Sequence, residues 1–462
     1  MNIIVMKTLF PCALMLALVF ATNVAAQQVQ SITLEEAIEI ALDKNFEIEL
    51  SRSEMDRAES QYRRQRADFL PDLNINLRGT RTIGRQFDPS IVAFDDFTTN
   101  NLNAGLSSSL ILFNGFRNIN QLRSARLGQE SAGERYQRTR EVIIFETAAR
   151  FLDVLLAGEL LEINKENLEA SRKQLEQVQA QVEVGMRPIV DQYSQESVVA
   201  NNELGVIQSE NILNLNKLRL SRLLQLDPMG EFDFVAPGIR EDEILVQDFE
   251  LREMIAIALM NRSDYRASEI EVQRARYELS ISQAGRVPQV SLSASLSTAY
   301  RDQQRDPAVG AIMPFSDQFF DANINRSVGF NVSVPIFNRW QTRTQIEQRR
   351  IDYRNAELRL EDFRQEIFLE LQQAYNDYMG YAKELEATEK ALIAAEKAYE
   401  TEQERYNVGS ATLIELTIAN NEYIRASSNR IQAMYQFIFQ DKVLDFFLGR
   451  ITEDFEIDAL MN

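Results

Sequence analysis

The sequence RYNVGSATLIE at residues 405–415 has a counterpart one half-chain earlier, QVEVGMRPIVD at residues 181–191. The two stretches align without a gap. In each, a helical pattern stops at Val-Gly and is expected to resume at an acidic residue, Asp191 or Glu415, six residues after the glycine. Glycine leaves a helix easily, and Pro188 suits the first turn of a new helix but forbids continuation of the old one. The pattern therefore predicts two helical hairpin tips.

The agreement between the two halves extends beyond the tips and indicates an internal repeat. Identical residue types recur with an offset of 217 residues early in each half, as at Pro71 and Pro288, and of 224 residues later, as at Gly185 and Gly409. The offset changes only once, in a stretch where an exposed loop would tolerate an insertion. We therefore expect two structural repeats, over residues 27–248 and 249–462, with tips at 182–188 and 406–412.

Composition points to an exported, elongated chain without disulfides. Residues 1–26 combine Lys7, an apolar run and a Val-Ala-Ala ending, the arrangement of a secretory signal peptide. The only cysteine, Cys12, lies in that segment, so packing or assembly must hold the mature chain together. A content of 17 Gly and 10 Pro in 462 residues is sparse and favours long helices. No later run approaches the ~20 apolar residues that a membrane helix needs.

The balance of residue types disfavours enzymes and nucleic-acid binding. The chain has no His, which removes the commonest general base and the commonest transition-metal ligand. A net charge of -20 would repel nucleic acid. The adjacent acids Asp95 and Asp96 have no other candidate catalytic residues near them in sequence, so a hydrolase is the weakest alternative. We expect no enzymatic activity, no cofactor, no metal site and no nucleic-acid partner.

Helical and strand periodicities alternate along each half. Thr33-Leu34-Glu35-Glu36 has the form of a capping box and begins an apolar stripe, which predicts a helix from Thr33 to about Phe69, ended by Pro71. Beyond the proline, apolar residues alternate with polar ones at the period of a strand. The sequence predicts four strands of roughly 10 residues, joined by exposed loops at 83–101 and 301–326; the strands are expected at about 71–82, 101–113, 288–300 and 326–337.

Strands with one apolar and one polar face are typical of transmembrane β-barrels. Four strands cannot close a barrel, since small closed barrels have about 8, so several chains would have to contribute strands. The alternative is a pair of soluble hairpins packed on the helices, although isolated hairpins are only marginally stable. Phe113, Phe337 and Trp340 are expected where strand meets helix, either in an interfacial aromatic belt or in the core.

Long helices are expected to connect the strands with the tips. The chain from Phe113 to Gly185 would span about 108 Å as a helix. Apolar residues recur every seven residues from Leu161 to Val182, and equivalent heptads precede the second tip, as in coiled coils. The remaining segments are expected to form a belt at mid-length, from an equatorial linker at 227–248 and the C-terminal tail after Gly449.

Taken together, these features resemble the TolC-type outer membrane factor family over the whole expected mature chain. The features are the Val-Gly tips followed by an acid, the Pro-terminated helix before a strand, the Phe-Asn strand exit and the repeat. The resemblance implies a mostly α fold with β, in which a homotrimer forms a long periplasmic coiled-coil barrel and a twelve-stranded barrel in outer membrane lipid. It also implies two partners for efflux or type I secretion, a periplasmic adaptor (membrane fusion) protein and an inner-membrane pump.

The resemblance assigns roles to residues at the tips. Asp191 and Tyr406 match residues that link neighbouring coils in the closed state of the channel. Ala411 departs from the pattern, since some members carry Arg there. The positions that match adaptor-docking residues are Val184, Gly185, Met186, Val408, Gly409 and Ser410.

The resemblance also implies an aperture lined by the second-repeat helices. Glu415 matches the first of two acids in the constriction, Ile418 replaces the second, and Glu422, one heptad on, extends the acidic face. Three copies of Glu415 near one axis would attract cations. Alternatively, Glu415 faces solvent or pairs with a basic residue. The alternative from another functional class is a structural periplasmic coiled-coil or adhesin-like stalk, which would share the heptads without needing the strands.

Overall fold

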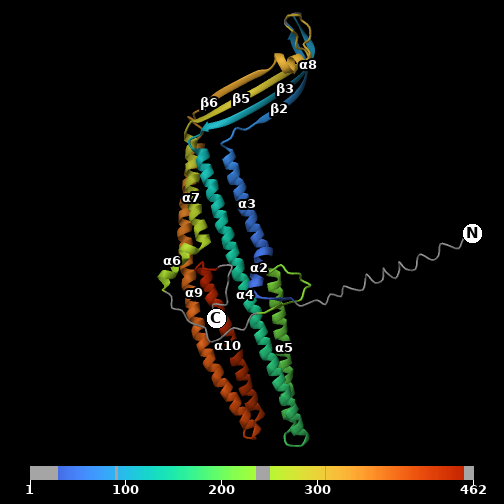
Figure 1. Ribbon diagram of the computed structural model, residues 1–462, viewed down its shortest axis with the longest axis vertical. Helices are drawn as coiled ribbons and strands as arrows, with labels where there is room; N and C mark the ends of the chain where they lie inside the picture. The colour runs from blue at the N-terminus through green and yellow to red at the C-terminus, as the bar shows by residue number, and fades with distance from the viewer. Residues whose placement is uncertain (1–29, 89–91, 236–249, 307, 452–462) are drawn as a thin grey trace, which may run out of the picture. The chain divides into compact units, whose positions relative to one another are not determined.

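The computed structural model describes residues 30–88, 92–235, 250–306 and 308–451, and Figure 1 shows the course of the chain. The chain divides into two compact units, each of which combines parts of both halves of the sequence. Unit 1 comprises residues 1–51, 136–263 and 365–462, and unit 2 comprises residues 52–135 and 264–364. The expected signal peptide at 1–26 lies outside the described residues.

The helices come in pairs of matched length. Helices α4 (Arg117–Glu183) and α9 (Gln341–Asn407) both have 67 residues, and α5 (Ile189–Leu223) and α10 (Leu413–Phe447) both have 35. The shorter α2 (Leu34–Lys44) and α6 (Leu251–Asn261) have 11 each and are followed by α3 (Phe46–Ala67) and α7 (Ser263–Gln283). These matched lengths are what the expected repeat requires. Among the described helices, none combines the length and the apolar character needed to cross a bilayer.

The first helix begins as expected but is interrupted. Thr33 Oγ1 accepts a hydrogen bond from Glu36 N (3.3 Å), and the Glu36 carboxylate accepts one from Thr33 N (3.0 Å), so the predicted capping box is confirmed. The expectation of one helix to Phe69 is wrong, because Asn45 adopts an extended backbone between α2 and α3. Asn45 Oδ1 accepts from Glu47 N at the start of α3 (2.8 Å), and Asn45 Nδ2 donates to Leu223 O (3.2 Å). These two hydrogen bonds stabilise the chain at the point where the helix is interrupted.

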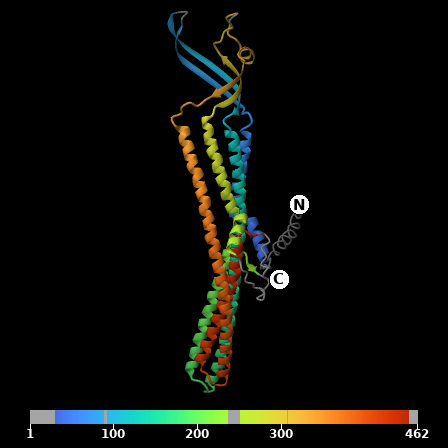
Figure 2. The ribbon, with the colours of Figure 1, turned by 90° about the vertical axis from the view of Figure 1, so that its left-hand side faces the viewer.

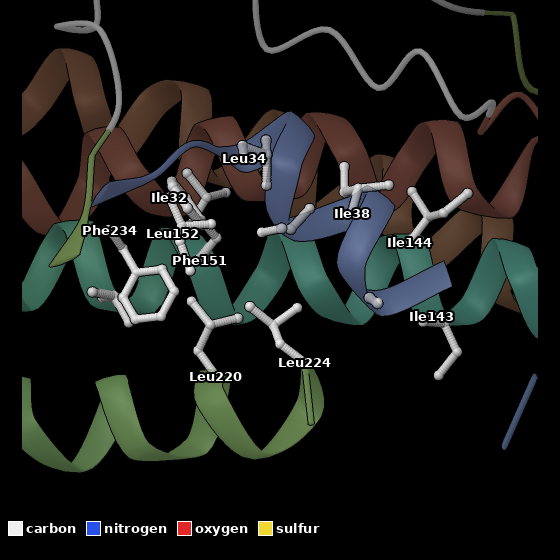
Figure 3. Packing of buried hydrophobic residues seen from close by; sticks show 14 of the residues in the cluster. Ile32, Leu34, Ile38, Ile143, Ile144, Phe151, Leu152, Leu220, Leu224 and Phe234 are labelled. Carbon is white, nitrogen blue, oxygen red and sulfur yellow. The ribbon is translucent and has the colours of Figure 1, made fainter. Parts of the chain in front are cut away.

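The core of unit 1 gathers α2, α4 and α5 around a short parallel strand pair (Figure 3). The pair consists of β1 (Gln30–Ile32) and β4 (Phe232–Phe234). Ile38 of α2, Phe151 of α4 and Leu220 of α5 are at most 2% exposed, and each such side chain contributes about 1.5–3 kcal/mol on burial. Of the expected belt, residues 236–248 and the tail from residue 452 lie outside the described residues.

Unit 2 contains a four-stranded antiparallel sheet in the order β2-β3-β5-β6 (Figure 1). Its strands confirm the four expected ones, with different ends: β2 (Asn74–Asp88), β3 (Ala93–Phe113), β5 (Gln289–Arg301) and β6 (Asn325–Ser333). The expected loop at 83–101 is wrong, because the ladder continues over residues 83–88 and 93–101 and pairs Arg85 with Asp96. Strand β6 ends at Ser333 instead of Phe337, since Pro335 has no N–H for a ladder.

The two faces of this sheet differ in chemistry because successive side chains alternate between them. Cross-strand register aligns Leu106 with Leu296 on one face, and Asn76, Gly105, Ser297 and Asn325 on the other. The apolar face is defined here by Ile75, Leu77, Leu106, Leu292, Leu296, Val328 and Phe330. The polar face is defined by Asn76, Arg78, Asn101, Asn103, Ser295, Ser297, Arg301, Asn325 and Ser327. On the polar face, the hydroxyls of Ser295 and Ser327 lie 2.7 Å apart.

Candidate functional site at the helical tips

The chain turns between α4 and α5 and between α9 and α10, where the tips were expected, and both turns have the same backbone geometry. Gly185 and Gly409 adopt φ of 76° and 77°, a left-handed conformation that other residues adopt only at a cost. At the first tip, Gly185 N donates to Val182 O (2.9 Å) and Met186 N donates to Gln181 O (2.8 Å). The second tip repeats this pair of bonds. This pattern is the Schellman motif, in which a left-handed residue satisfies the last carbonyl groups of a helix.

Each return helix begins two residues before the acid at which the sequence pattern placed it. Helix α10 starts at Leu413 because Thr412 caps it: Glu415 N donates to Thr412 Oγ1 (3.2 Å), and the Glu415 carboxylate accepts from Thr412 N (2.7 Å). Helix α5 starts at Ile189 after Pro188, which provides no side-chain cap. The acids at 191 and 415 thus occupy the first turn, where a negative charge interacts favourably with the helix dipole.

Glu415 is exposed, and its position is fixed by the cap. The hydrogen bond from the Thr412 backbone N–H lowers the pKa of the Glu415 carboxyl, so the group is ionised at neutral pH. The sequence analysis missed this cap, although Thr-x-x-Glu is the same signature that it recognised at Thr33. Ile418 is 58% exposed, and Glu422 forms an ion pair with Arg425 (2.5 Å) on the surface of α10.

Arg187 connects the first tip with the second. Its Nε donates to Gln181 Oε1 (2.6 Å), its Nη1 lies 3.3 Å from Asp191 Oδ2, and its guanidinium lies 4.3 Å from the ring centroid of Tyr406. Sequence reasoning missed Arg187, although the repeat offset of 224 residues places it opposite Ala411. Position 411 of the second tip thus carries Ala, and the equivalent position of the first tip carries Arg187.

Figure 2 shows the helices of the two hairpins of unit 1. An apolar cluster joins these hairpins, and its buried members are Val178 of α4, Tyr406 of α9, and Leu413 and Leu416 of α10. Burial raises the pKa of the Tyr406 phenol, and its hydroxyl finds no hydrogen-bond partner among the described residues. Further from the tip, Asn420 Nδ2 donates to Asn167 Oδ1 (3.0 Å). One protomer therefore presents its two tips as a packed pair.

The expected docking residues lie at the surface of this pair of tips. Val184, Met186 and Val408 are 69%, 77% and 80% exposed, and the two glycines and Ser410 between them are exposed as well. Ile189 and Ile414 enlarge the apolar surface. Within the described part of the chain, no group of His, Cys, Asp and Glu is arranged to hold a metal ion.

Comparison with known proteins identifies the family. The model of the family described as outer membrane efflux protein matches residues 37–224 and 254–450. The chain is 22% identical to outer membrane protein TolC of Escherichia coli strain K12, over 99% of this chain and 89% of TolC. It is 26% identical to the pyoverdine export outer membrane protein OpmQ of Pseudomonas aeruginosa, over 75% of this chain and 70% of OpmQ.

Solved structures show the same fold. The CmeC outer membrane channel of Campylobacter jejuni superposes with a TM-score of 0.77 at 16% identity, over 92% of this chain and 87% of CmeC. The expected fold class, mostly α with β and of the TolC type, is confirmed. Because the family match spans both halves and includes both tips, this chain belongs to the outer membrane efflux protein family.

Proposed function

We propose that this protein is the outer membrane exit duct of a tripartite efflux or type I secretion system. In this proposal the duct is passive and opens when a periplasmic adaptor and an inner-membrane pump dock. The observation that carries the proposal is the apolar face of the sheet, where Ile75 and Val328 are 79% and 78% exposed. Burial of such a side chain is worth about 1.5–3 kcal/mol, so this face favours an apolar surrounding such as lipid. A stalk protein in the aqueous periplasm would expose this apolar face to water, which is unfavourable.

Three protomers would complete the barrel. Strands β2 and β6 lie at the two edges of the described sheet, and a sheet in lipid requires every backbone N–H and C=O group to be paired. Pairing β6 of one protomer with β2 of the next would close a ring of twelve strands in a homotrimer. Native mass spectrometry of detergent-extracted protein tests this proposal. A trimer is the expected result, and a stable folded monomer would contradict the shared barrel.

The exposed tips support docking to an adaptor. Exposed Val184, Met186 and Val408 offer apolar contacts that solvent alone disfavours. A photo-crosslinking residue at Val184 or Val408 should capture the adaptor in cells that contain the complete system. The same residue at Glu169, an exposed position of α4 away from the tip, serves as the control and should not capture it. Equal capture at all three positions would argue against docking at the tips.

Arg187 and Glu415 would act in gating. The Arg187 guanidinium lies over the Tyr406 ring, a contact that would hold one hairpin against the other in the closed duct. Glu415, fixed by its cap and ionised, would contribute one of three carboxylates that meet near the trimer axis. We propose that opening separates Arg187 from Tyr406 and moves the helices that carry Glu415 away from the axis.

A further inference from the structure

The polar face of the sheet in unit 2 carries two arginines. Arg78 lies in β2 and Arg301 at the end of β5, and β3 between them contributes Asn101 and Asn103. Arg78 pairs with Asn103 of β3, which pairs on its other side with Ala299 of β5. Arg301 of β5 pairs with Asn101 of β3. The two arginines are therefore separated by one strand and by two residues along the ladder. Both line a hollow of about 660 Å³ with Asn76, Asn103, Asn323 and Asn325.

Among the described residues, no carboxylate neutralises these two arginines. The residues that line the hollow include no acid, and within the described residues no ion pair involves either guanidinium. Asp302 follows Arg301 in sequence, but its carboxylate accepts a hydrogen bond from Asn100 instead. On the polar face, positions 74–82 of β2 and 99–107 of β3, with all of β5 and β6, carry no ionisable residue besides Arg78 and Arg301.

The backbone around Arg301 is held in place by a buried amide. Gln318, which is fully buried, accepts a hydrogen bond from Arg301 N (2.9 Å) and donates one to Arg301 O (3.0 Å). Asn323 donates to Ala299 O (2.6 Å) and exchanges hydrogen bonds with Gln304. Arg78 lies within a continuous antiparallel ladder. Both guanidinium groups thus extend from fixed backbone, an arrangement that costs little reorganisation when an anion approaches.

We infer that Arg78 and Arg301 form an anion-attracting collar in the lumen of the duct, so that the cargo class that it favours is anionic. The inference rests on the proposed function, since the polar face becomes the lumen wall only if the apolar face contacts lipid. Three protomers would then place six guanidinium groups around one aqueous passage. Guanidinium groups recognise carboxylate and phosphate groups through paired N–H donors, and the asparagine amides beside them supply further donors.

The net charge of -20 makes this collar distinctive. The net negative charge of the chain would repel an anion, whereas the collar would attract it. Solutes with carboxylate or phosphate groups would therefore be concentrated at this place in the passage. The collar and the Glu415 carboxylates have opposite charges, and Glu415 belongs to unit 1 whereas the two arginines belong to unit 2.

Ion selectivity of the purified protein in planar bilayers tests the collar. For a monovalent anion about 10 Å from each group in 0.1 M salt, the screened attraction of one guanidinium raises the local concentration of the anion about 1.3-fold. Arg78→Gln or Arg301→Gln, which each remove three charges from a trimer, should lower the attraction of an anion about two-fold and the repulsion of a cation by the same factor. The anion-to-cation permeability ratio should therefore fall about five-fold in each single variant and about twenty-fold in the double variant. Reversal potentials in a KCl gradient measure this ratio.

Arg326→Gln provides the matched control. Arg326 lies in β6 in register with Leu296, so it belongs to the opposite face of the same sheet, and its replacement removes the same charge. The ratio should stay at the wild-type value in this variant. An unchanged ratio in the double variant, or an equal change in Arg326→Gln, would overturn the collar while leaving the duct intact. A stable folded monomer in native mass spectrometry would overturn the shared barrel of the duct and the collar with it.

Inorganic triphosphate is a second probe that reports on the same groups. Added to the chamber that the barrel faces, it should reduce the wild-type current by occupying the collar. The concentration needed should rise at least about five-fold in the double variant, because a multivalent anion loses more attraction than a monovalent one. Equal potency of triphosphate on wild type and double variant would show that it acts elsewhere and would refute the collar.

Discussion

Replacement of Arg187 by alanine should loosen the two hairpins of a protomer from each other. Of the three contacts that Arg187 makes, those to Gln181 and Asp191 stay within the first hairpin, and only the contact with the Tyr406 ring reaches the second. The substitution therefore removes one polar connection between the tips and leaves the apolar cluster around Val178 in place.

The structure indicates the size of the effect. The side chain of Arg187 is 19% exposed and Tyr406 is 5% exposed, so the cation–π contact is largely shielded from water. A contact of this kind is worth about 1 to 2 kcal/mol, or about 5- to 30-fold in the equilibrium between joined and separated tips. Because the substitution also leaves Asp191 unpaired, a double-mutant cycle with Tyr406→Leu is needed to isolate the contact itself.

Spin labels at Val184→Cys and Val408→Cys would report the distance between the tips, since both positions are exposed and Cys12 is the only native cysteine. In trimers formed with an excess of unlabelled protomers, so that each contains one labelled protomer, dipolar EPR should give one narrow distance distribution for the otherwise native protein. Arg187→Ala should add a second, longer population. Arg187→Lys should fall between them, because an ammonium group keeps the charge beside Asp191 but lacks the planar surface that stacks on a ring.

Arg405→Ala is the matched control for this experiment. Arg405 also lies at a tip, but its contacts, to Glu402 (2.5 Å) and to the carbonyl oxygen of Ser410 (3.3 Å), stay within the second hairpin. Its replacement should leave the distance distribution unchanged. The reasoning fails if Arg187→Ala gives the native distribution, or if Arg405→Ala widens it as much.

Three further predictions concern the tips and the core. Gly185→Leu or Gly409→Leu should strain a left-handed turn by about 1–2 kcal/mol. Adaptor crosslinking should fall while the yield of trimer stays constant. Normal crosslinking would mean that the tip is a loop without a docking role. Glu415→Gln should weaken cation selectivity and block by multivalent cations in single-channel recordings; if Asp191→Asn alone changes them, the gate lies elsewhere. Burial raises the pKa of Tyr435 in the folded protein to about 12. Above pH 10 the unfolded chain therefore loses the phenol proton at a lower pH than the folded protein does. The free energy of unfolding should fall by up to about 3 kcal/mol by pH 12. Urea denaturation of Tyr435→Phe should lack this fall, and an identical fall would assign it to other groups.

Local signals allowed much of the fold to be predicted. Two glycines followed by helix-starting patterns located both tips, and alternation located all four strands. The break at Asn45 was not predictable, because it depends on a hydrogen bond to Leu223, which is distant in sequence. The extension of the first hairpin through 83–101 was missed because its charged residues look like a loop, although on neighbouring strands Arg85 and Asp96 can pair.

The candidate site was predictable only in part. The family resemblance selected Tyr406 and Asp191, but the residue that contacts both is Arg187, whose role depends on how two hairpins meet in space. The repeat itself contained a usable signal, since aligning the halves places Arg187 opposite Ala411. The cap of Glu415 was also encoded locally, in Thr412 three residues before it.

The sheet of unit 2 makes a newly exported chain vulnerable before it assembles. A lone protomer would carry β2 and β6 as free edges together with an exposed apolar face, the combination that promotes aggregation. Formation of the proposed trimer would therefore compete with misassembly, and this competition would depend on how many protomers are present at once. At a low concentration of protomers in the periplasm, more protomers would be lost to proteolysis before they assemble. A high concentration of protomers would favour both assembly and off-pathway association. A holding chaperone that covers β2 and β6 would resolve this conflict, and its binding would end when a neighbouring strand takes its place.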